Sequence, residues 1–234
     1  MNFADIHCHA LPCIDDGSPN IETTLIMLED NLRQGIDGVV FTPHYYSDCS
    51  ISDFIEKRNT SAAELHRELK KLGRHLGISC LCGAEVYYKP SLLEEEDIKD
   101  LCIGGTNYLL LEMPFAKWEA SSLRNINILI NSFGLTPVIA HIERYLPYNE
   151  KDVIKSLLNM NICVQMNAGF LLNRKTTKKA KALIKDGIID FLASDCHNTE
   201  SRPQNLEAAL NILYDSGMSF YADSFVSNSK IFFK

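Results

Sequence analysis

Short apolar runs alternate with longer amphipathic segments along nearly the whole chain, and this alternation constrains the fold more than any other feature. Seven apolar runs are predicted as strands, at residues 3–8, 38–42, 79–83, 108–113, 136–140, 162–165 and 189–193. Helical spacing of apolar residues predicts helices at residues 21–34, 52–76, 120–133, 151–159, 175–186 and 202–216. Strands that alternate with helices of this length predict an α/β fold with a parallel sheet and right-handed crossovers. The periodicity fits both an open doubly wound sheet and a closed barrel.

The chain has 234 residues and no linker, repeat or low-complexity tract, so we expect one domain over residues 1–234. Its 23 basic and 30 acidic residues give a net charge of −7, which argues against a nucleic-acid partner. No apolar run approaches the roughly 18 residues of a membrane span, and no secretion signal is recognisable. We therefore expect a cytoplasmic protein that is not integral to a membrane. The eight cysteines contain no C-x-x-C pair, and most are interpreted as reduced core thiols.

Potential metal ligands stand at or just after the C-terminal ends of six of the seven predicted strands. They are His7, His9, Asp16, His44, Glu85, Glu112, His141, Asp195 and His197. Active sites of parallel α/β folds form at this edge of the sheet. The other two histidines, His66 and His75, fall in a helix rich in Lys and Arg and are interpreted as surface residues. A single ligand of this kind is a weak signal, but so many at one edge predict a site for more than one metal.

The types of these residues indicate which metals would bind. His7 and His9 are two residues apart on a strand, so their imidazoles point the same way and can chelate one ion. Glu85 and Glu112 are candidate carboxylate bridges between two ions. A carboxylate-rich set without thiolates suits Mn, Fe or Zn better than a metal that prefers sulfur.

Two arginines predict that the ligand carries phosphate. Arg144 and Arg202 each follow a strand-end histidine within five residues, and guanidinium groups bind phosphate oxygens bidentately. Cys196 and Arg202 also form the C-x5-R spacing of cysteine-dependent tyrosine phosphatases. The residues between them include no Gly, however, and Glu200 would repel a phosphate. A metal-dependent mechanism is therefore favoured over a cysteine nucleophile.

These residues lie in stretches that resemble a known family. The stretches are DIHCHALPCIDDGS, TPHYY, GAEVYY, YLLLEMPF, PVIAHIERY and ASDCHNTESRP, and together they cover nearly the whole chain. The sequence resembles the PHP (polymerase and histidinol phosphatase) superfamily. Within it, the sequence is most similar to the manganese-dependent bacterial protein-tyrosine phosphatases of capsule and exopolysaccharide loci.

The resemblance implies a distorted seven-stranded (β/α)7 TIM-like barrel that holds up to three divalent metals, Mn²⁺ with Fe or Zn as alternatives, at the C-terminal mouth of its strands. Carried over by motif, one metal would be held by His7, His9, Glu85 and Asp195. A second would be held by Glu85, Glu112 and His141, and a third by Asp16, His44 and His197. Arg144 and Arg202 would bind the phosphate. Metal-bound water is the simplest candidate for the general acid, and Asp16, if not fully committed to a metal, is another.

The chain departs from the family at the rim of the implied site. Cys13 stands where family members usually have a small residue, often Gly. Tyr45 and Tyr46 follow His44, where many relatives place basic or amide residues. Together with Tyr87 and Tyr88, these tyrosines are candidates for lining an open mouth, although packing under the loops explains them equally well.

The resemblance implies hydrolysis of protein phosphotyrosine by a hydroxide that the metals activate, with the Tyr-rich tail of a polysaccharide-export tyrosine kinase as the partner. Three alternatives stay open. The first is a phosphatase of the same superfamily for a small molecule such as histidinol phosphate. The second is a metal-dependent nuclease of the TatD type, and the third is a catalytically silent metal-binding regulator that scaffolds a kinase complex.

Overall fold

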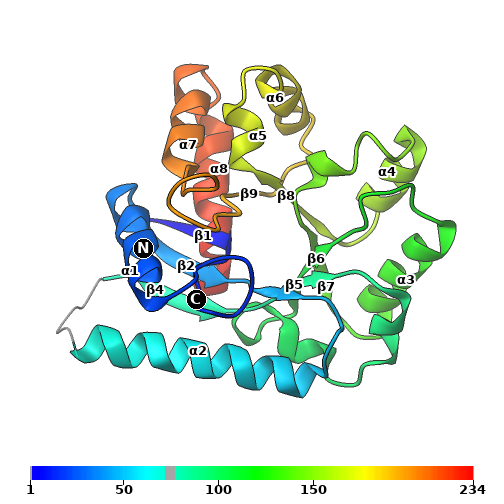
Figure 1. The fold of residues 1–234 in the computed structure, drawn as a ribbon. Helices are drawn as coiled ribbons and strands as arrows, with labels where there is room; N and C mark the ends of the chain where they lie inside the picture. Colours follow the sequence, from blue (N-terminus) through cyan, green and yellow to red (C-terminus); the bar gives the residue numbers. More distant parts are fainter. Residues whose placement is uncertain (1, 72–76, 234) are drawn as a thin grey trace.

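The computed structural model describes residues 2–71 and 77–233, and it has an α/β fold built on parallel strands (Figure 1). One sheet has the strand order β1 (Phe3–Cys8), β2 (Ile36–Phe41), β4 (Ser79–Cys82). The other has the order β3 (His44–Tyr45), β5 (Glu85–Tyr87), β6 (Tyr108–Glu112), β7 (Thr136–Ile139), β8 (Cys163–Asn167), β9 (Phe191–Ala193). Every pair of neighbours is parallel, as the alternation predicts.

The described residues form nine strands rather than seven, because the second and third strands each continue, after a break, beyond their predicted ends. The second breaks at Pro43, which has no N–H to donate, and resumes as β3. The third breaks at Gly83 and Ala84 and resumes as β5. Hydrogen bonds still cross both breaks: Gly83 N–H donates to Phe41 O at 2.8 Å, and Glu85 N–H donates to Pro43 O at 3.0 Å. His44 and Glu85, two of the predicted ligands, are the first residues of the strands that follow these breaks.

The end of β9 runs beside the end of β1. Asp195 N–H donates to His7 O at 3.0 Å, and His9 N–H donates to Cys196 O at 2.9 Å. The first and last strands, which belong to different sheets, are thereby joined at the same edge that carries the predicted ligands.

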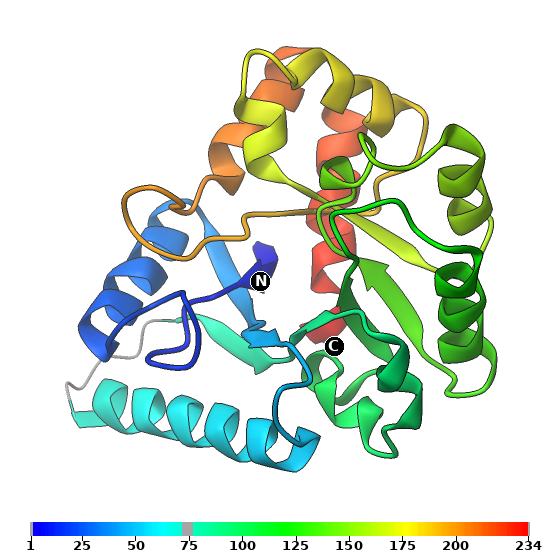
Figure 2. The ribbon, with the colours of Figure 1, turned by 45° about the vertical axis from the view of Figure 1, so that its right-hand side comes forward.

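Helices surround the strands on the outside (Figure 2). Six of them confirm predicted segments: α1 (Ile21–Arg33), α2 (Ile51–Lys71), α3 (Ala120–Asn131), α4 (Lys151–Leu158), α6 (Thr177–Lys185) and α7 (Leu206–Asp215). Residues 72–76 of the second predicted helix, which include His75, lie outside the described residues. The prediction that the last helix begins at residue 202 is wrong, because Pro203 disfavours helical backbone at the residue before it.

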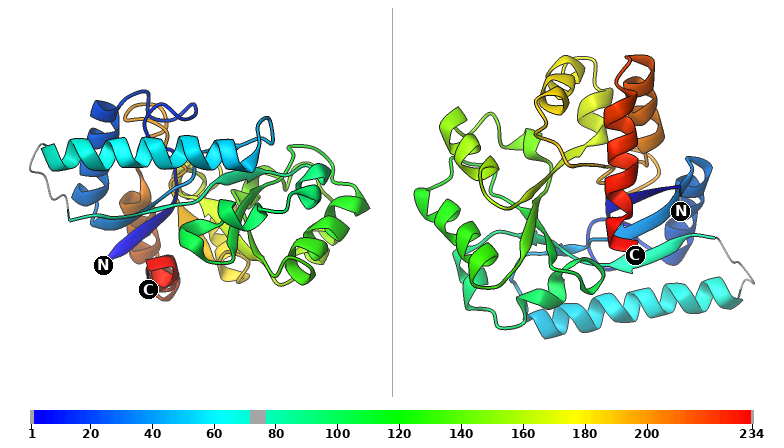
Figure 3. Two further views of the ribbon diagram at one scale, coloured as in Figure 1. Left: turned by 90° about the horizontal axis from the view of Figure 1, so that it is seen from below. Right: turned by 180° about the vertical axis from the view of Figure 1, so that it is seen from behind.

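Several elements of the structure are absent from the prediction. They are α5 (Ala168–Leu172), α8 (Ser219–Ser229) and the 3-10 helices η1 (Pro90–Glu94), η2 (Ile98–Leu101), η3 (Ile103–Gly105), η4 (Ile142–Arg144) and η5 (Lys230–Phe233). Viewed from behind, α8 crosses the strands beside β1 (Figure 3). Its Ser229 hydroxyl accepts a hydrogen bond from Ala4 N–H at 3.1 Å. The end of the described chain is therefore fastened to the first strand.

Apart from β4, which is exposed or half-buried along its length, the strands are largely buried on both faces. One face packs in the large core under the helices, with Val39, Leu111 and Ile139 among its residues. The other face forms a second cluster, which consists of Ile6, Val40, Ile103, Leu110, Val138, Ala140, Phe191, Ala193 and Phe232. Burial on both faces is typical of parallel sheets covered by helices. Phe232 lies 5.1 Å from the Tyr108 ring and 5.5 Å from the Phe191 ring, at the strand starts and away from the predicted site.

All eight cysteines are free, and five of them lie in the core or pack against it, since Cys82 and Cys163 are half-buried against the core clusters. Only Cys8, Cys102 and Cys196 are buried. Cys13 is exposed and has a φ of +57°, in the left-handed region that glycine adopts most readily. This conformation explains why a small residue, often Gly, suits the position in the family.

Candidate functional site

All nine predicted metal ligands converge at the C-terminal edge of the strands. His7, His44, Glu85 and Glu112 lie within or at the ends of strands β1, β3, β5 and β6, while the others lie on the loops that follow strands. The side chains of His7 and His9 are fully buried, whereas that of Asp16 is 64% exposed. His66 is exposed on α2, as predicted. The site therefore has a buried floor of histidines and carboxylates and one carboxylate at its opening.

Glu85 stands at the centre of the first group. Its Oε2 lies 3.2 Å from His7 Nε2 and 3.2 Å from His9 Nε2, and these two nitrogens are 3.1 Å apart. Asp195 Oδ1 approaches the same nitrogens at 3.5 and 3.7 Å. Ligand atoms of all four residues lie within 4.8 Å of one another, so a single cation would fit among them.

The other oxygen of Glu85 faces a second group. His141 Nε2 lies 2.8 Å from Glu85 Oε1 and 3.5 Å from Glu112 Oε1. His44 Nδ1 lies 3.0 Å from Glu85 Oε2, and His44, Glu85 and Glu112 also offer ligand atoms within 4.8 Å of one another. Glu85 thus lies between two groups of nitrogen ligands, as a bridging carboxylate would.

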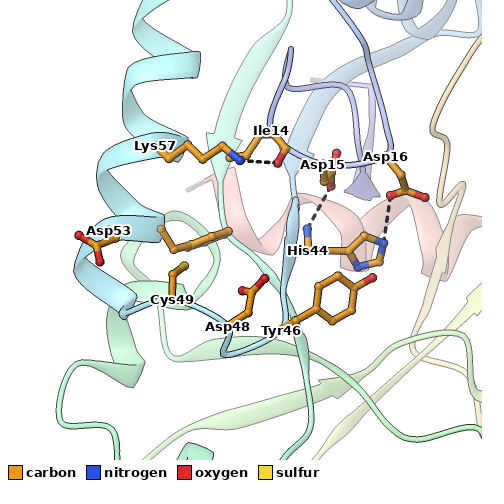
Figure 4. Close-up of a pocket in the computed structure, with 10 residues that line it drawn as sticks. Ile14, Asp15, Asp16, His44, Tyr46, Asp48, Cys49, Asp53 and Lys57 are labelled. Atoms are coloured by element: carbon orange, nitrogen blue, oxygen red, sulfur yellow. Dashed lines mark hydrogen bonds and ion pairs between the residues drawn. The ribbon is translucent and has the colours of Figure 1, made fainter.

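A third group forms around Asp16 (Figure 4). Its Oδ1 lies 3.4 Å from His44 Nε2 and 3.5 Å from His197 Nε2. His9 belongs to the same group by distance, although the family motif assigns it to the first metal alone. His9 and Glu85 therefore link the three groups into one continuous cluster.

The orientation of the imidazoles fits metal binding. Nδ1 of four histidines is held by an oxygen that is not itself a proposed ligand atom: Gln165 Oε1 for His7, Asp15 Oδ2 for His9, the Tyr145 hydroxyl for His141 and the backbone carbonyl of Asp195 for His197. Such partners fix the ring and leave Nε2 free, as in protein metal sites. Three buried atoms of the cluster have no hydrogen-bond partner, namely His44 Nδ1, Glu85 Oε2 and His197 Nε2. Because buried polar atoms are rarely left unpaired, this donor set suits divalent cations.

Residues that the sequence did not single out hold the ligands in place. Asp15 accepts hydrogen bonds from His9 Nδ1 at 2.7 Å and from His44 N at 3.0 Å. Gln165 Oε1 accepts from the backbone N–H of His141 at 2.7 Å, and Gln165 Nε2 donates to Asn167 at 2.8 Å. A polar pair two residues apart on a buried strand was the signal that could have identified Gln165 and Asn167.

Two ligands occupy strained backbone positions. His141 has a φ of +32° and Asp195 has a φ of +56°, and neither is a glycine. Such conformations cost about 1–3 kcal/mol and cluster at functional sites. The Asp195 carboxylate is fixed by Asn167 Nδ2 at 2.8 Å, so its direction is set by the surrounding structure.

The two arginines lie at the opening, on either side of Asp195. Arg144 donates to Asp195 Oδ2 at 2.7 Å, and Arg202 donates to Asp195 Oδ1 at 2.8 Å. Each arginine side chain remains 37% exposed. The structure therefore places both cations beside the cluster and within reach of an anion that enters from solvent.

Charges within the cluster shift the ligand pKa values in opposite directions. Burial opposes ionisation of Glu85, but the neighbouring His7, His141 and His44 outweigh it and hold the pKa of that carboxyl well below its usual range. Burial likewise disfavours the charged form of His9, but the hydrogen bond to Asp15 and the nearby negative charge of Glu85 raise its pKa to about 10. Without metal, protons on His7 and His9, whose pKa values are both raised, balance part of the carboxylate charge, so metal ions must displace these protons to bind.

Only some of the four tyrosines that were candidates for lining the mouth of the site are accessible there. Tyr45 and Tyr88 are buried and cannot line the mouth, while Tyr46 is exposed and Tyr87 is half-buried. Tyr46 borders a cavity of about 650 Å³ that also touches Asp16 and His44 (Figure 4). Phe115, which the sequence did not single out, is exposed on the other side of the cluster, near His141.

Gly17 has no room for a side chain, and Gly17→Ala is expected to lower turnover by at least about 100-fold. A Cβ on Gly17 would lie 2.0 Å from His9 O and 2.6 Å from His9 Cβ, so the loop would have to move and take Asp15 away from His9. Overpacking of this kind also costs about 1–3 kcal/mol of stability. Steady-state kinetics and urea unfolding measure both effects.

Gly169→Ala is the matched control for Gly17→Ala. In α5, the nearest atom to an added Cβ at Gly169 is Asn205 Nδ2 at 3.8 Å, an ordinary contact. Alanine also favours helix over glycine. Equal losses in the two variants would show that the close approach of Gly17 to His9 is not what the site needs.

The raised pKa of Glu143 is expected to make the free energy of unfolding depend on pH. Burial raises its pKa from 4.5 to about 7. As pH rises above 4.5, the unfolded chain loses this proton first, so the native state is progressively destabilised until pH 7, by about 3 kcal/mol in all. In metal-free protein, Glu143→Gln is therefore expected to match the wild type at pH 4 and to exceed its unfolding free energy by about that amount at pH 8. Urea titrations at both pH values test this, with exposed Glu94→Gln as the control; equal stability of Glu143→Gln and wild type at pH 8 would contradict the expectation.

Comparison with known proteins places this geometry in a family. A family model described as "Capsular polysaccharide synthesis, CpsB/CapC" matches residues 3–234. The chain belongs to the CpsB/CapC family. It is 32% identical to the tyrosine-protein phosphatase CpsB of Streptococcus agalactiae, over 98% of each chain.

Comparison with solved structures agrees with the assignment of this chain to the CpsB/CapC family. The fold matches a crystal structure from a study of YwqE from Bacillus subtilis and CpsB from Streptococcus pneumoniae, described as unique metal-dependent tyrosine phosphatases. The TM-score is 0.80 at 26% identity, over 98% of this chain and 93% of the other. The organophosphorus hydrolase from Deinococcus radiodurans shares the fold alone, with a TM-score of 0.56 at 13% identity over 99% and 92% of the two chains. Among the described residues, no helix is both long and apolar enough to span a bilayer.

Proposed function

We propose that this protein is a metal-dependent phosphatase that hydrolyses phosphotyrosine in proteins. The observation that carries the proposal is the convergence of nine nitrogen and oxygen ligands, with Arg144 and Arg202 at the opening. Membership of the CpsB/CapC family supports the reaction, because relatives of this family are tyrosine-protein phosphatases.

The proposal includes a closed architecture. We count β2 and β3 as one interrupted strand and β4 and β5 as another, because each pair is consecutive in the chain and the hydrogen bonds between the two interrupted strands continue at the breaks. With the contact between β9 and β1, this gives a distorted (β/α)7 barrel over residues 1–234, formed as a single domain. The second core cluster would then be the barrel interior, and the metal ligands would stand at its mouth.

We assign up to three metal ions, with Mn²⁺ as the favoured metal. His7, His9, Glu85 and Asp195 would hold the first, Glu85, Glu112 and His141 the second, and Asp16, His44 and His197 the third. The mixture of imidazole and carboxylate ligands without thiolate supports Mn²⁺, and Fe or Zn are the alternatives. Each of the three proposed metal sites includes at least one residue with a buried atom that lacks a hydrogen-bond partner. Glu85 belongs to the first two sites, and His44 and His197 belong to the third.

When bound, divalent ions supply positive charge to the phosphoryl oxygens and lower the pKa of water. The protein's own residues position the substrate. Arg144 and Arg202 grip the phosphate and neutralise charge on its oxygens, with Asp195 fixing both guanidinium groups. The leaving phenol has a pKa of about 10 and needs little protonation. Asp16 is exposed at the opening, where its carboxyl could deliver a proton to that oxygen.

The exposed rim favours a protein substrate over a small molecule. Both arginines, Asp16 and Tyr46 are accessible from solvent, so a phosphotyrosine on a flexible chain could reach the cluster. We propose the Tyr-rich tail of a tyrosine kinase that controls polysaccharide export as the physiological partner. The cysteine mechanism has no support, because Cys196 is buried with its Sγ 3.3 Å from Cys8 Sγ.

The test compares a phosphotyrosine peptide with histidinol phosphate, each incubated with Mn²⁺-loaded protein. We expect the peptide to be turned over at least about 100-fold more efficiently, as kcat/KM measured by phosphate release. The reverse preference would assign the protein a small-molecule substrate while leaving the metal site intact. No turnover of either compound would overturn the proposed reaction.

A further inference from the structure

Two exposed aromatic rings flank the metal cluster. The exposed large hydrophobic residues of the described chain are Ile26, Tyr46, Phe115, Ile128, Tyr148, Tyr214 and Phe220. Of these, Tyr46 and Phe115 have ring contacts with proposed metal ligands, and they are 41% and 43% exposed. Single exposed apolar side chains are common on protein surfaces, but these two rings both contact the ligand cluster, where the apolar part of a bound ligand would meet them.

Tyr46 forms one side of the opening. Its ring stacks on His44 with centroids 4.9 Å apart and an interplanar angle of 23° (Figure 4). The Tyr87 ring lies 5.9 Å away, and Lys89 Nζ donates to the Tyr46 carbonyl. The ring is therefore supported from the protein side while its other surface faces solvent.

Phe115 forms the other side. Its ring stacks on Tyr145 with centroids 5.6 Å apart at 25°, and it lies 5.9 Å from the His141 ring. The Arg144 guanidinium carbon is 5.9 Å from the same ring, within the range of a cation–π contact. Phe115 is thus fixed beside one of the two arginines proposed to bind phosphate.

The two rings follow the two strands that flank β5: Tyr46 comes directly after β3 and Phe115 comes after β6, and β5 between them carries Glu85. His44, on which the Tyr46 ring stacks, contacts Glu85 Oε2. His141, beside the Phe115 ring, contacts Glu85 Oε1. A phosphate held over Glu85 by the arginines would direct its organic substituent outward, past these rings. A flat aromatic substituent can stack on both rings, but an aliphatic one cannot make such contacts.

We propose that Tyr46 and Phe115 are specificity-determining residues that hold the phenyl ring of phosphotyrosine between them. This inference rests on the proposed function and adds the means by which the site distinguishes an aryl phosphate from phosphate itself. The two rings bind the phenyl group, and the cluster and the arginines bind the phosphoryl group.

The experiment separates binding of the ring from binding of the phosphate. Tyr46→Ala, Phe115→Ala and the double variant are loaded with Mn²⁺, and KM for a phosphotyrosine peptide is measured beside the inhibition constant of inorganic phosphate. Aromatic pairs of this kind predict a KM increase of about fivefold for each ring and about 25-fold for both. The inhibition constant of inorganic phosphate is expected to stay within about twofold, because phosphate has no ring.

Two further variants make the result interpretable. Tyr46→Phe keeps the ring and should recover most of the KM lost in Tyr46→Ala. Phe220→Ala removes a 77% exposed ring from α8 and should leave both constants unchanged. Unchanged KM in the double variant, or equal weakening of peptide and inorganic phosphate, would overturn the inference. Failure of the wild type to hydrolyse the peptide would instead be a failure of the proposed function.

Discussion

Glu85→Gln is expected to lower kcat/KM for a phosphotyrosine peptide by about 1000-fold and to remove bound metal. Glu85 contacts His7, His9, His44 and His141, and it is the carboxylate common to the first two proposed metal sites. Metal ions contribute several kcal/mol to stabilisation of a phosphoryl transition state, and each 1.4 kcal/mol is a factor of ten in rate. The amide of glutamine is neutral, and one of its two terminal atoms is an NH2 group. That group would face imidazole nitrogens that in the wild type lie against a negatively charged carboxylate oxygen.

Elemental analysis of the purified variant and steady-state kinetics with added Mn²⁺ measure both parts of this expectation. Glu94→Gln makes the same chemical change at an exposed position and should retain wild-type metal content and turnover. Near-normal activity in Glu85→Gln would mean that the carboxylate at the centre of the cluster is not a metal ligand, and the assignment of the first two sites would be wrong.

His197→Ala and Cys196→Ser should differ widely although the residues are neighbours. His197 Nε2 is buried without a partner and faces Asp16, so its loss should dismantle the third metal site and cost at least about 100-fold in kcat/KM. Cys196 points the other way, against Cys8, and its loss should change turnover by less than about threefold once folding is verified by circular dichroism.

Cys196→Ala accompanies the serine variant, because a buried hydroxyl without a partner can destabilise the fold by itself. The contradicting result is specific. Inactive Cys196→Ser and Cys196→Ala proteins that fold and retain full metal content would indicate a cysteine nucleophile and would overturn the metal mechanism.

The ligands at the strand ends could be predicted from the sequence, whereas the residues that hold those ligands by hydrogen bonds could not be predicted as well. Strand alternation and the placement of His, Asp and Glu were sufficient to bring His7, Glu85 and Asp195 to one edge, because parallel strands share their direction. The interruption at Pro43 was readable in principle, since proline cannot donate to a sheet ladder. At the break after the third strand, a Cβ on Gly83 would lie 3.1 Å from Ile103, and no local pattern encodes that close approach.

The rim was the least predictable part of the site. Tyr45 and Tyr46 are adjacent and identical in type, yet one is buried under α2, 5.1 Å from the Phe54 ring, and the other is exposed on His44. Phe115 belongs to an apolar stretch after β6, and nothing in the sequence around it indicated a role in binding. Its role depends on Tyr145 and Arg144, which approach it only in the folded chain.

The most direct test of the central claim is to strip the protein of metal with a chelator, remove the chelator, and titrate Mn²⁺ while following phosphate release from a phosphotyrosine peptide. The account predicts no turnover without metal and recovery that saturates with up to three bound ions per chain, counted by elemental analysis. Turnover that is unchanged in the metal-free protein would contradict it, because the cluster of histidines and carboxylates would then have no part in the reaction.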